Sequence, residues 1–145
     1  MKLLVQRVSE AGVNIDNENI ATISKGILVF VGFDPSDSIT EITKLTKKLL
    51  NYKIFNDSNG RVAHSVLEAE AEILLVPQVT LSVSTNKGLK PSFSGAANPE
   101  KGLSLFNAFK GHLEENYTRI KVGRFGANMS VSLINEGPIT YWFEQ

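Results

Sequence analysis

Residues Gly26–Phe33 have the sequence GILVFVGF, an apolar run with the length of one β-strand. No polar residue interrupts the run, as is typical of a strand that is covered by other elements on both faces. We therefore expect this strand to lie at the centre of the core and the rest of the fold to be arranged around it.

A helix is predicted directly after this strand. Ser38-Ile39-Thr40-Glu41 has the capping-box pattern, in which serine and glutamate satisfy free N–H groups at a helix start. One apolar stripe follows at helical spacing: Ile39, Ile42, Leu45 and Leu49. The opposite side carries charges: Glu41, Lys44, Lys47 and Lys48. We interpret the segment as a helix that covers the core and turns a solvated face outward.

Strand-like segments occur along the whole chain. They are Lys2–Ser9, Val13–Ile15, Ile20–Ser24, Tyr52–Phe55, Glu72–Leu81, Arg119–Gly123, Met129–Ile134 and Ile139–Phe143. Pro77 should break strand pairing within its segment, because proline has no N–H to donate. Asn98-Pro99 predicts the start of a second helix, with one apolar face formed by Leu103, Phe106, Phe109, Leu113 and Tyr117.

Strands and helices do not alternate regularly along the chain, which argues against a doubly wound parallel sheet. We predict an α+β protein with one domain over residues 1–145. Its core should be a curved, barrel-like mixed β-sheet with two main helices packed on one side.

Composition excludes several kinds of site. The 145-residue chain has no cysteine and only two histidines, His64 and His112, far apart in sequence. A disulfide scaffold, a thiol nucleophile and a zinc–thiolate site are therefore excluded, and we expect neither a metal nor a cofactor. Lysine plus arginine equals aspartate plus glutamate at 15 each. Proteins that wrap duplex nucleic acid are usually basic, so we expect no DNA partner and only local contacts to any RNA.

The start of the chain, MKLLVQRVSEAGV, lacks the longer apolar stretch of a signal peptide. No segment approaches the roughly 20 apolar residues of a transmembrane helix. We expect a cytoplasmic protein with no membrane partner.

Common catalytic motifs are absent. No Gly-x-Ser-x-Gly elbow, Walker A loop or dinucleotide fingerprint occurs, and neither histidine is placed to act as the base of a triad. The alternating Glu68, Glu70 and Glu72 are interpreted as a solvated acidic strip.

Two short segments stand out. Pro77-Gln78-Val79-Thr80-Leu81 places an amide and a hydroxyl after an apolar strand; it is also compatible with an ordinary strand end. Asn135-Glu136-Gly137-Pro138-Ile139-Thr140 is compatible with a simple hairpin turn. It can also be interpreted as a functional segment, in which a rigid backbone at a pocket mouth excludes one hand of an amino acid. Gly-Pro bonds adopt the cis form at modest cost, and glycine lets the backbone approach a ligand closely.

Together these segments resemble the D-aminoacyl-tRNA deacylase family, which carries Ser-Gln-Phe-Thr-Leu-like and Asn-x-Gly-Pro-Val-Thr-like motifs. Three further stretches look like family features: Gln6-Arg7-Val8, Lys87-Gly88-Leu89-Lys90-Pro91-Ser92-Phe93 and Phe125-Gly126-Ala127-Asn128-Met129. The resemblance covers essentially the whole chain in the right order.

The resemblance implies a homodimer with active sites at the subunit interface. A cis Gly137-Pro138 pair from one subunit would enter the partner's pocket and exclude L-amino acids, so that D-aminoacyl-tRNA and glycyl-tRNA are accepted. Thr80 and Gln78 would be the catalytic positions, with hydrolysis assisted by the ribose 2′-hydroxyl of the tRNA end. Substrate-binding positions would be Gly137, Pro138, Leu81, Met129, Phe125 and Arg7. Lys87, Lys90, Arg119, Lys121 and Arg124 are candidates for phosphate contacts.

The sequence departs from the pattern at Pro77, in place of serine, and at Val79, in place of phenylalanine. A related branch carries Pro-Gln here, holds its Gly-Pro pair trans, and acts on L-alanyl-tRNA mischarged on a threonine tRNA. That branch therefore remains an alternative. A non-catalytic module that binds tRNA ends is another, motivated by the missing triad.

Overall fold

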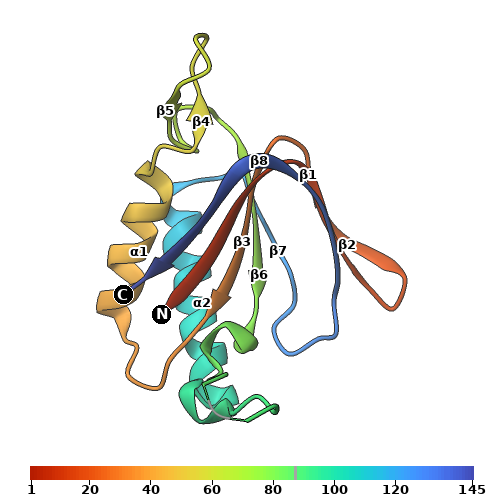
Figure 1. Ribbon diagram of the computed structural model, residues 1–145, viewed down its shortest axis with the longest axis vertical. Coiled ribbons are helices and arrows are strands. Elements are labelled where there is room, and N and C mark those ends of the chain that lie inside the picture. The colour runs from red at the N-terminus through yellow and green to blue at the C-terminus, as the bar shows by residue number, and fades with distance from the viewer. Residues whose placement is uncertain (87) are drawn as a thin grey trace.

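The computed structural model describes residues 1–86 and 88–145, and its centre is a strongly bent sheet with helices on one face (Figure 1). The strands are β1 (Lys2–Ile15), β2 (Glu18–Ile23), β3 (Gly26–Gly32), β4 (Phe55–Asn56), β5 (Val62–His64), β6 (Glu72–Pro77), β7 (Ile120–Val122) and β8 (Ser130–Glu144). The helices are α1 (Ile39–Asn51) and α2 (Pro99–Asn116), with short 3-10 turns η1 (Val79–Ser82) and η2 (Phe93–Gly95).

Strand β1 organises the sheet. Its first part pairs antiparallel with β3, and its last part, from Ala11 to Ile15, pairs antiparallel with β2. Strand β8 runs antiparallel along the opposite edge of β1 for nearly its whole length. Because β2 and β3 share one edge of β1, the sheet bends and nearly closes on itself, as Figure 1 shows.

The other half of the sheet is parallel. Strand β3 pairs in parallel with β6, and β6 with β7, which gives a mixed sheet of order β2-β1-β3-β6-β7. Helices α1 and α2 make the two connections between these parallel strands, and the carboxyl ends of β3 and β6 consequently point to the same edge. Strands β4 and β5 form a separate two-stranded hairpin.

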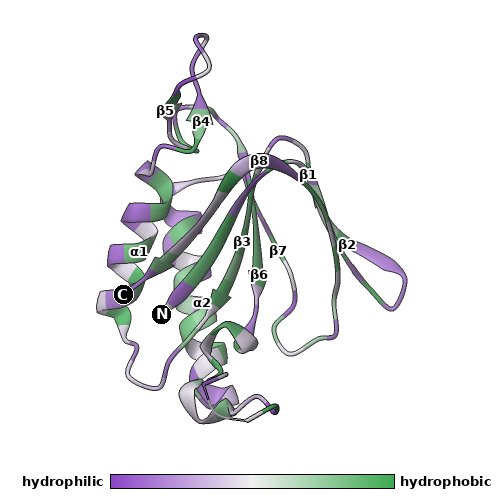
Figure 2. Cartoon of the chain, viewed as in Figure 1, coloured by the Kyte–Doolittle hydropathy of each residue, from purple (hydrophilic) through white to green (hydrophobic). Residues whose placement is uncertain are grey.

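Apolar side chains form two cores, one on each face of the bent sheet. The larger core lies between the sheet and the helices and includes Phe106, Phe109 and Leu45. The smaller core fills the inside of the bend and includes Leu28 and Leu74. Neighbouring residues of β3 and β6 point alternately into the two cores, so the middle of each strand, Ile27–Val31 and Ile73–Val76, is hydrophobic without interruption (Figure 2).

The predicted fold is confirmed in its main features: one domain with a nearly closed, barrel-like mixed sheet and two main helices on one side. The run Gly26–Phe33 contains β3, seven residues long and buried at all but one of them. Ser38 and Glu41 form the predicted capping box of α1. The side chain of Asn98 caps α2 by accepting from Lys101 N. No helix in the described part of the chain is long and apolar enough to cross a membrane.

Several predicted boundaries are wrong. Lys2–Ser9 and Val13–Ile15 form one strand, β1. Met129–Ile134, apart from Met129 itself, and Ile139–Phe143 lie on one strand, β8. The segment around Gly137 is therefore not a hairpin turn, because the chain leaves β1 only briefly and then returns to the same partner. The predicted strand Tyr52–Phe55 is shifted, since α1 continues to Asn51 and β4 begins at Phe55.

Candidate active site

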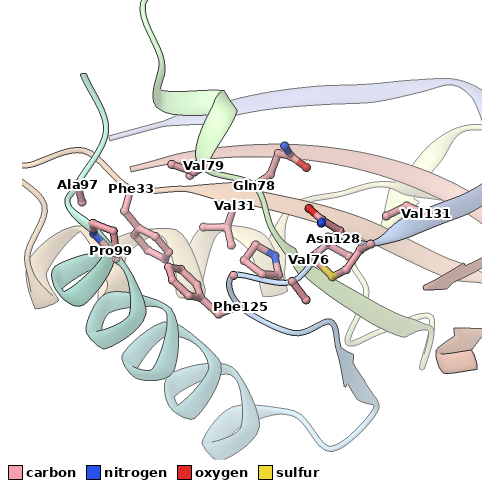
Figure 3. Close-up of a pocket in the computed structure, with 16 residues that line it drawn as sticks. Val31, Phe33, Val76, Gln78, Val79, Ala97, Pro99, Phe125, Asn128 and Val131 are labelled. Carbon is pink, nitrogen blue, oxygen red and sulfur yellow. The ribbon is translucent and has the colours of Figure 1, made fainter. Parts of the chain in front are cut away.

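A cavity of about 500 Å³ lies at the carboxyl ends of β3 and β6, beside the first turn of α2 (Figure 3). This edge of a parallel sheet is where ligands commonly bind, because the strand ends and helix starts leave a crevice there. The lining residues come from four segments: Val31, Gly32 and Phe33; Val76, Pro77, Gln78 and Val79; Ala97, Pro99 and Gly102; and Phe125, Gly126, Ala127, Asn128, Met129 and Val131.

The wall formed by η1 depends on how β6 ends. Strand pairing stops at Pro77, as predicted, and the Gln78 N–H donates to Val31 O at 2.7 Å. The chain then turns into η1 across Gly32. A Cβ on Gly32 would lie 2.9 Å from the Leu81 Cβ and 3.0 Å from Gln78 O. Glycine at this position is what lets the turn close against β3.

The polar groups of the cavity are amides. Gln78 and Asn128 lie across the cavity from Phe33, Phe125 and Pro99 in Figure 3. The side-chain amide of Gln78 donates to the Thr80 hydroxyl. None of the described lining residues carries an ionisable side chain. The site can therefore orient a substrate by hydrogen bonds, but the lining offers no general acid or base.

Two carboxylates, Asp34 and Glu100, directly follow lining residues along the chain, and the first of them is already engaged. Asp34 follows the lining residue Phe33 and accepts from Lys2 Nζ at 2.6 Å. Burial alone would raise the pKa of Asp34, but the hydrogen bond from Lys2 and the charge of the N-terminal amine hold that pKa below its ordinary value. A carboxylate stabilised in this way is a weak base and is not suited to activate water.

Aromatic rings close the far side of the cavity. Phe125 packs against the buried Phe106 with ring centroids 5.8 Å apart. Gly102, on the first turns of α2, faces the same ring, and a Cβ added there would lie 3.2 Å from Phe125 Cζ. Because Gly102 has no side chain, the Phe125 ring can lie close against α2, and this position of the ring sets the width of the cavity.

Gly137 and Pro138 lie elsewhere in the protomer, in a short detour of β8. Val8 pairs with Asn135 and Gln6 with Thr140, so the four residues Glu136–Ile139 stand opposite a single residue of β1, Arg7. We call Glu136–Ile139 the Gly-Pro excursion. Its peptide bond between Gly137 and Pro138 is cis, the form that the resemblance implies for the D-selective branch. Both residues are exposed.

Two side chains fasten the Gly-Pro excursion to the sheet. Arg7 is 5% exposed, and its Nε donates to Glu136 O at 3.3 Å while its Nη1 donates to Ile54 O at 2.8 Å. The Asn135 amide donates to Arg7 O at 3.0 Å and to Ile139 O at 3.1 Å. The exposed Gly-Pro pair is thereby held in place by a buried guanidinium and a bridging amide.

The structure brings some of the predicted site residues together and separates others. Gln78, Phe125 and Met129 line the cavity. Thr80 and Leu81 lie on η1, the turn that follows Gln78 in the chain. Arg7 and the Gly-Pro excursion do not reach it: Arg7 pairs with Ile27, at the far end of β3 from Val31. Ile27 and Val31 are four residues apart on β3, which corresponds to roughly 13 Å along the strand.

Other lining residues were not predicted from the sequence: Val31, Gly32, Phe33, Val76, Ala97, Pro99, Gly102, Gly126, Ala127, Asn128 and Val131. The useful signal would have been the parallel pairing of β3 and β6, which places the residues after both strands at one edge.

The described residues contain no group of three or more histidine or acidic side chains that could hold a metal ion.

Some of the proposed phosphate contacts are already paired. Arg119 forms an ion pair with Glu70 at 3.8 Å, and Lys121 with Glu72 at 3.3 Å. Lys90 and Arg124 are exposed and have no ion pair within the described part of the chain. Lys87 lies outside the described residues. Arg124, next to the lining residue Phe125, is thus an available cation near the cavity.

Comparison with known proteins places this geometry in a family. The family model described as D-Tyr-tRNA(Tyr) deacylase matches residues 4–144. A D-aminoacyl-tRNA deacylase of Ectopseudomonas mendocina is 42% identical over 99% of both chains. One from Shewanella denitrificans is 44% identical over 97% of both chains.

Solved structures agree with these matches. A protein titled c-Myc DNA unwinding element binding protein has a TM-score of 0.96 and 38% identity, over 100% of this chain and 99% of that one. A probable eukaryotic D-amino acid tRNA deacylase has the same fold, with a TM-score of 0.85 and 18% identity, over 98% and 97% of the two chains. The matches span nearly all of the sequence, and this chain belongs to the D-aminoacyl-tRNA deacylase family, hydrolases that act on the ester bond of aminoacyl-tRNA.

Proposed function

We propose that the protein hydrolyses D-aminoacyl-tRNA to a free D-amino acid and tRNA in the cytoplasm, and also accepts glycyl-tRNA(Ala). It rejects L-aminoacyl-tRNA by steric exclusion. The active form is a homodimer, in which the Gly-Pro excursion of one copy stands at the cavity of the other.

The observation that carries this proposal is the position of the Gly-Pro excursion. It is exposed and fastened by Arg7 and Asn135, yet it lies at the far end of β3 from the cavity of its own chain. A two-fold dimer contact is reciprocal, so it would place each excursion at the other copy's cavity. Backbone atoms at Gly137 would then oppose the α-carbon of the substrate, whatever its side chain.

Exposed apolar side chains support a dimer contact at both places. On β8, Ile134 is 55% exposed and Trp142 47% exposed, and they flank the Gly-Pro excursion in sequence. At the rim of the cavity, Val79 is 49% exposed. Burying such side chains against a second copy removes apolar surface from water and stabilises the assembly.

The chemistry follows from the composition of the cavity lining, in which no described residue is ionisable. Gln78 and Thr80 hold the ester next to η1, where the first N–H groups of the turn have no partner within the turn. Leu81, Met129 and Phe125 shape the surrounding wall. The ribose 2′-hydroxyl of the tRNA end assists attack by water, so that neither a side-chain nucleophile nor a metal is needed.

Paired substrates test the proposal. We expect D-tyrosyl-tRNA and D-aspartyl-tRNA to be hydrolysed and the L-forms to be spared, while light scattering gives the mass of a dimer. Equal rates for both hands, or no hydrolysis of either, would contradict it. So would full activity of a monomer.

Pro77 and Val79 favour one second candidate, the relaxed branch that hydrolyses L-alanyl-tRNA(Thr). Pro77 ends β6 without a serine hydroxyl, and Val79 leaves more space at the rim than phenylalanine would. Adding L-alanyl-tRNA(Thr) to the same assay separates the candidates, because only the relaxed branch cleaves it faster than D-tyrosyl-tRNA.

A further inference from the structure

We propose that the outer face of α1, formed by Lys44, Lys47, Lys48 and Tyr52, binds the phosphate backbone of the tRNA body, away from the reacting ester. We call these four residues the α1 basic face. This inference rests on the proposed function, since it assigns a second contact region to the same substrate.

The α1 basic face concentrates positive charge in a protein with no net charge. Its three lysines lie within five consecutive residues, and they line a shallow hollow together with Asn51 and Tyr52. Like charges three and four residues apart on a helix repel one another. None of the three lysines forms an ion pair among the described residues, whereas Lys53, Lys110 and Lys121 each do.

α1 has one acidic residue against three lysines, so its negative charge only partly balances theirs. The closest acidic residue along the helix is Glu41, and its carboxylate is occupied in the capping box, accepting from Ser38 N at 2.9 Å and from Ser38 Oγ at 2.7 Å. The repulsion among the lysines is therefore relieved best by an external anion. Phosphates in a row, as on a nucleic acid backbone, match several cations along one helix.

An ordered aromatic ring lies beside these charges. Tyr52 is 39% exposed and packs edge-on against Tyr141 and Phe143, with centroids 5.3 Å and 4.8 Å apart. Lys48 Nζ lies 4.6 Å from the centre of the Phe143 ring. These contacts fix the base of the hollow. A fixed tyrosine next to ammonium groups offers a phosphate a hydroxyl donor as well as charge.

The position of α1 suits a contact with the double-stranded part of tRNA. The loop that leads into α1 starts at Phe33, which lines the cavity, and this loop meets the start of α2, where Lys101 Nζ donates to Pro35 O. Lys44 to Lys48 therefore lie roughly 8 to 14 Å along α1 from its cavity end. Double-stranded RNA is recognised mainly through phosphates and 2′-hydroxyls, which needs cations and donors but no sequence readout.

The test compares two double variants that remove the same charge. Lys44→Gln with Lys47→Gln removes two unpaired lysines of the face, and Lys53→Gln with Lys110→Gln removes two paired lysines elsewhere. Glutamine and lysine have similar helix propensities, so α1 should fold in both. Lys48 is left in place because its packing on Phe143 contributes to the core.

For D-tyrosyl-tRNA at about 0.1 M salt, we expect the α1 double variant to raise KM at least ~3-fold with kcat unchanged. The slope of log KM against log salt concentration should fall by about 1.5, as for two lost phosphate contacts. The control variant should match the unmodified protein. If both variants change KM alike, or if neither changes KM, the inference is overturned. An unchanged KM is also the result expected if the face binds an acidic protein or an anionic membrane instead of tRNA.

A mobility-shift titration with uncharged tRNA separates this inference from the proposed function. If the unmodified protein hydrolyses nothing, the proposed function fails, and weaker tRNA binding by the α1 variant alone still supports the face. If hydrolysis is intact and all three proteins bind tRNA equally, the face has no role in tRNA binding.

Discussion

The buried guanidinium of Arg7 donates to the backbone carbonyl of Glu136 at 3.3 Å, which ties β1 to the residue before Gly137. An ion pair, 3.2 Å from Arg7 Nε to Glu136 Oε2, also joins the same two residues. A buried side chain of β1 thus fixes the position of the Gly-Pro excursion, although the excursion itself is exposed.

Replacing Arg7 by lysine should uncouple the Gly-Pro excursion from the sheet. Lysine keeps the charge but lacks the planar fork that reaches Ile54 O, Asn56 Oδ1 and Glu136 O together. We expect the free energy of unfolding to fall by about 2 kcal/mol in urea titrations. Discrimination between D- and L-tyrosyl-tRNA should fall at least ~10-fold, about 1.4 kcal/mol. Arg61→Lys, at an exposed position, is the control, and unchanged discrimination in Arg7→Lys would refute this role.

Gly137→Ala should separate activity from stability. A Cβ on Gly137 would meet only Asn135 Oδ1, at 3.8 Å, so the protomer has room for it. Thermal unfolding should therefore be unchanged within about 2 °C. In the proposed dimer the methyl group would meet the other copy's substrate, so kcat/KM for D-tyrosyl-tRNA should fall at least ~10-fold. Loss of stability without loss of activity would show that Gly137 acts only within its own chain.

Gly102→Ala should narrow the cavity. The new Cβ would lie 3.2 Å from Phe125 Cζ, so the ring must shift into the space that a substrate uses. We expect KM for D-tyrosyl-tRNA to rise about 10-fold. Gly111→Ala is the matched control, because it makes the same change on the same helix with no heavy atom within 4 Å. Equal kinetics of the two variants would mean that Phe125 does not contact the substrate.

Thr80→Ala tests whether the protein supplies the nucleophile. The Thr80 hydroxyl accepts a hydrogen bond from Gln78, and none of the described residues that line the neighbouring cavity is a base. We expect less than about a 10-fold loss in kcat, the scale of one lost hydrogen bond, and a much larger loss when the tRNA ends in 2′-deoxyadenosine. An inactive Thr80→Ala together with normal cleavage of the deoxy substrate would establish the opposite mechanism.

Glu68 gives a prediction for pH. A hydrogen bond from Lys53, at 2.6 Å, and a further one from Ser65 N lower the pKa of Glu68 from 4.5 to about 2. Because the folded pKa is depressed, this stabilisation is present above the unfolded pKa of 4.5 and declines as pH falls from there through about 2. The unmodified protein should therefore melt higher than Glu68→Gln at pH 7, and the difference should vanish near pH 2. A difference that stays constant down to that pH would contradict the shift.

The elements that were predicted well have strong local signals. The apolar run that contains β3, the capping box at Ser38 and the Asn98-Pro99 helix start depend on neighbouring residues only. The break at Pro77 also followed from local chemistry, because a missing N–H ends a ladder wherever the strand lies. Predictions failed where a boundary depends on the partner strand: β1 continues through Ser9–Gly12 because β8 pairs beside it.

The sequence by itself determined where the two helices and the central strand lie, that no thiol or zinc–thiolate chemistry is available, and which two short motifs resemble a deacylase. Those properties depend on hydrophobic spacing, capping and residue type, which act over a few neighbouring residues. Only the tertiary structure decided that β3 and β6 run in parallel and so open a cavity beside Gly102. It alone placed Gly137 and Pro138 far from that cavity, on a detour held by Arg7. Contacts between residues more than a hundred positions apart, such as Arg7 to Glu136, depend on how the sheet closes, and no local pattern records them.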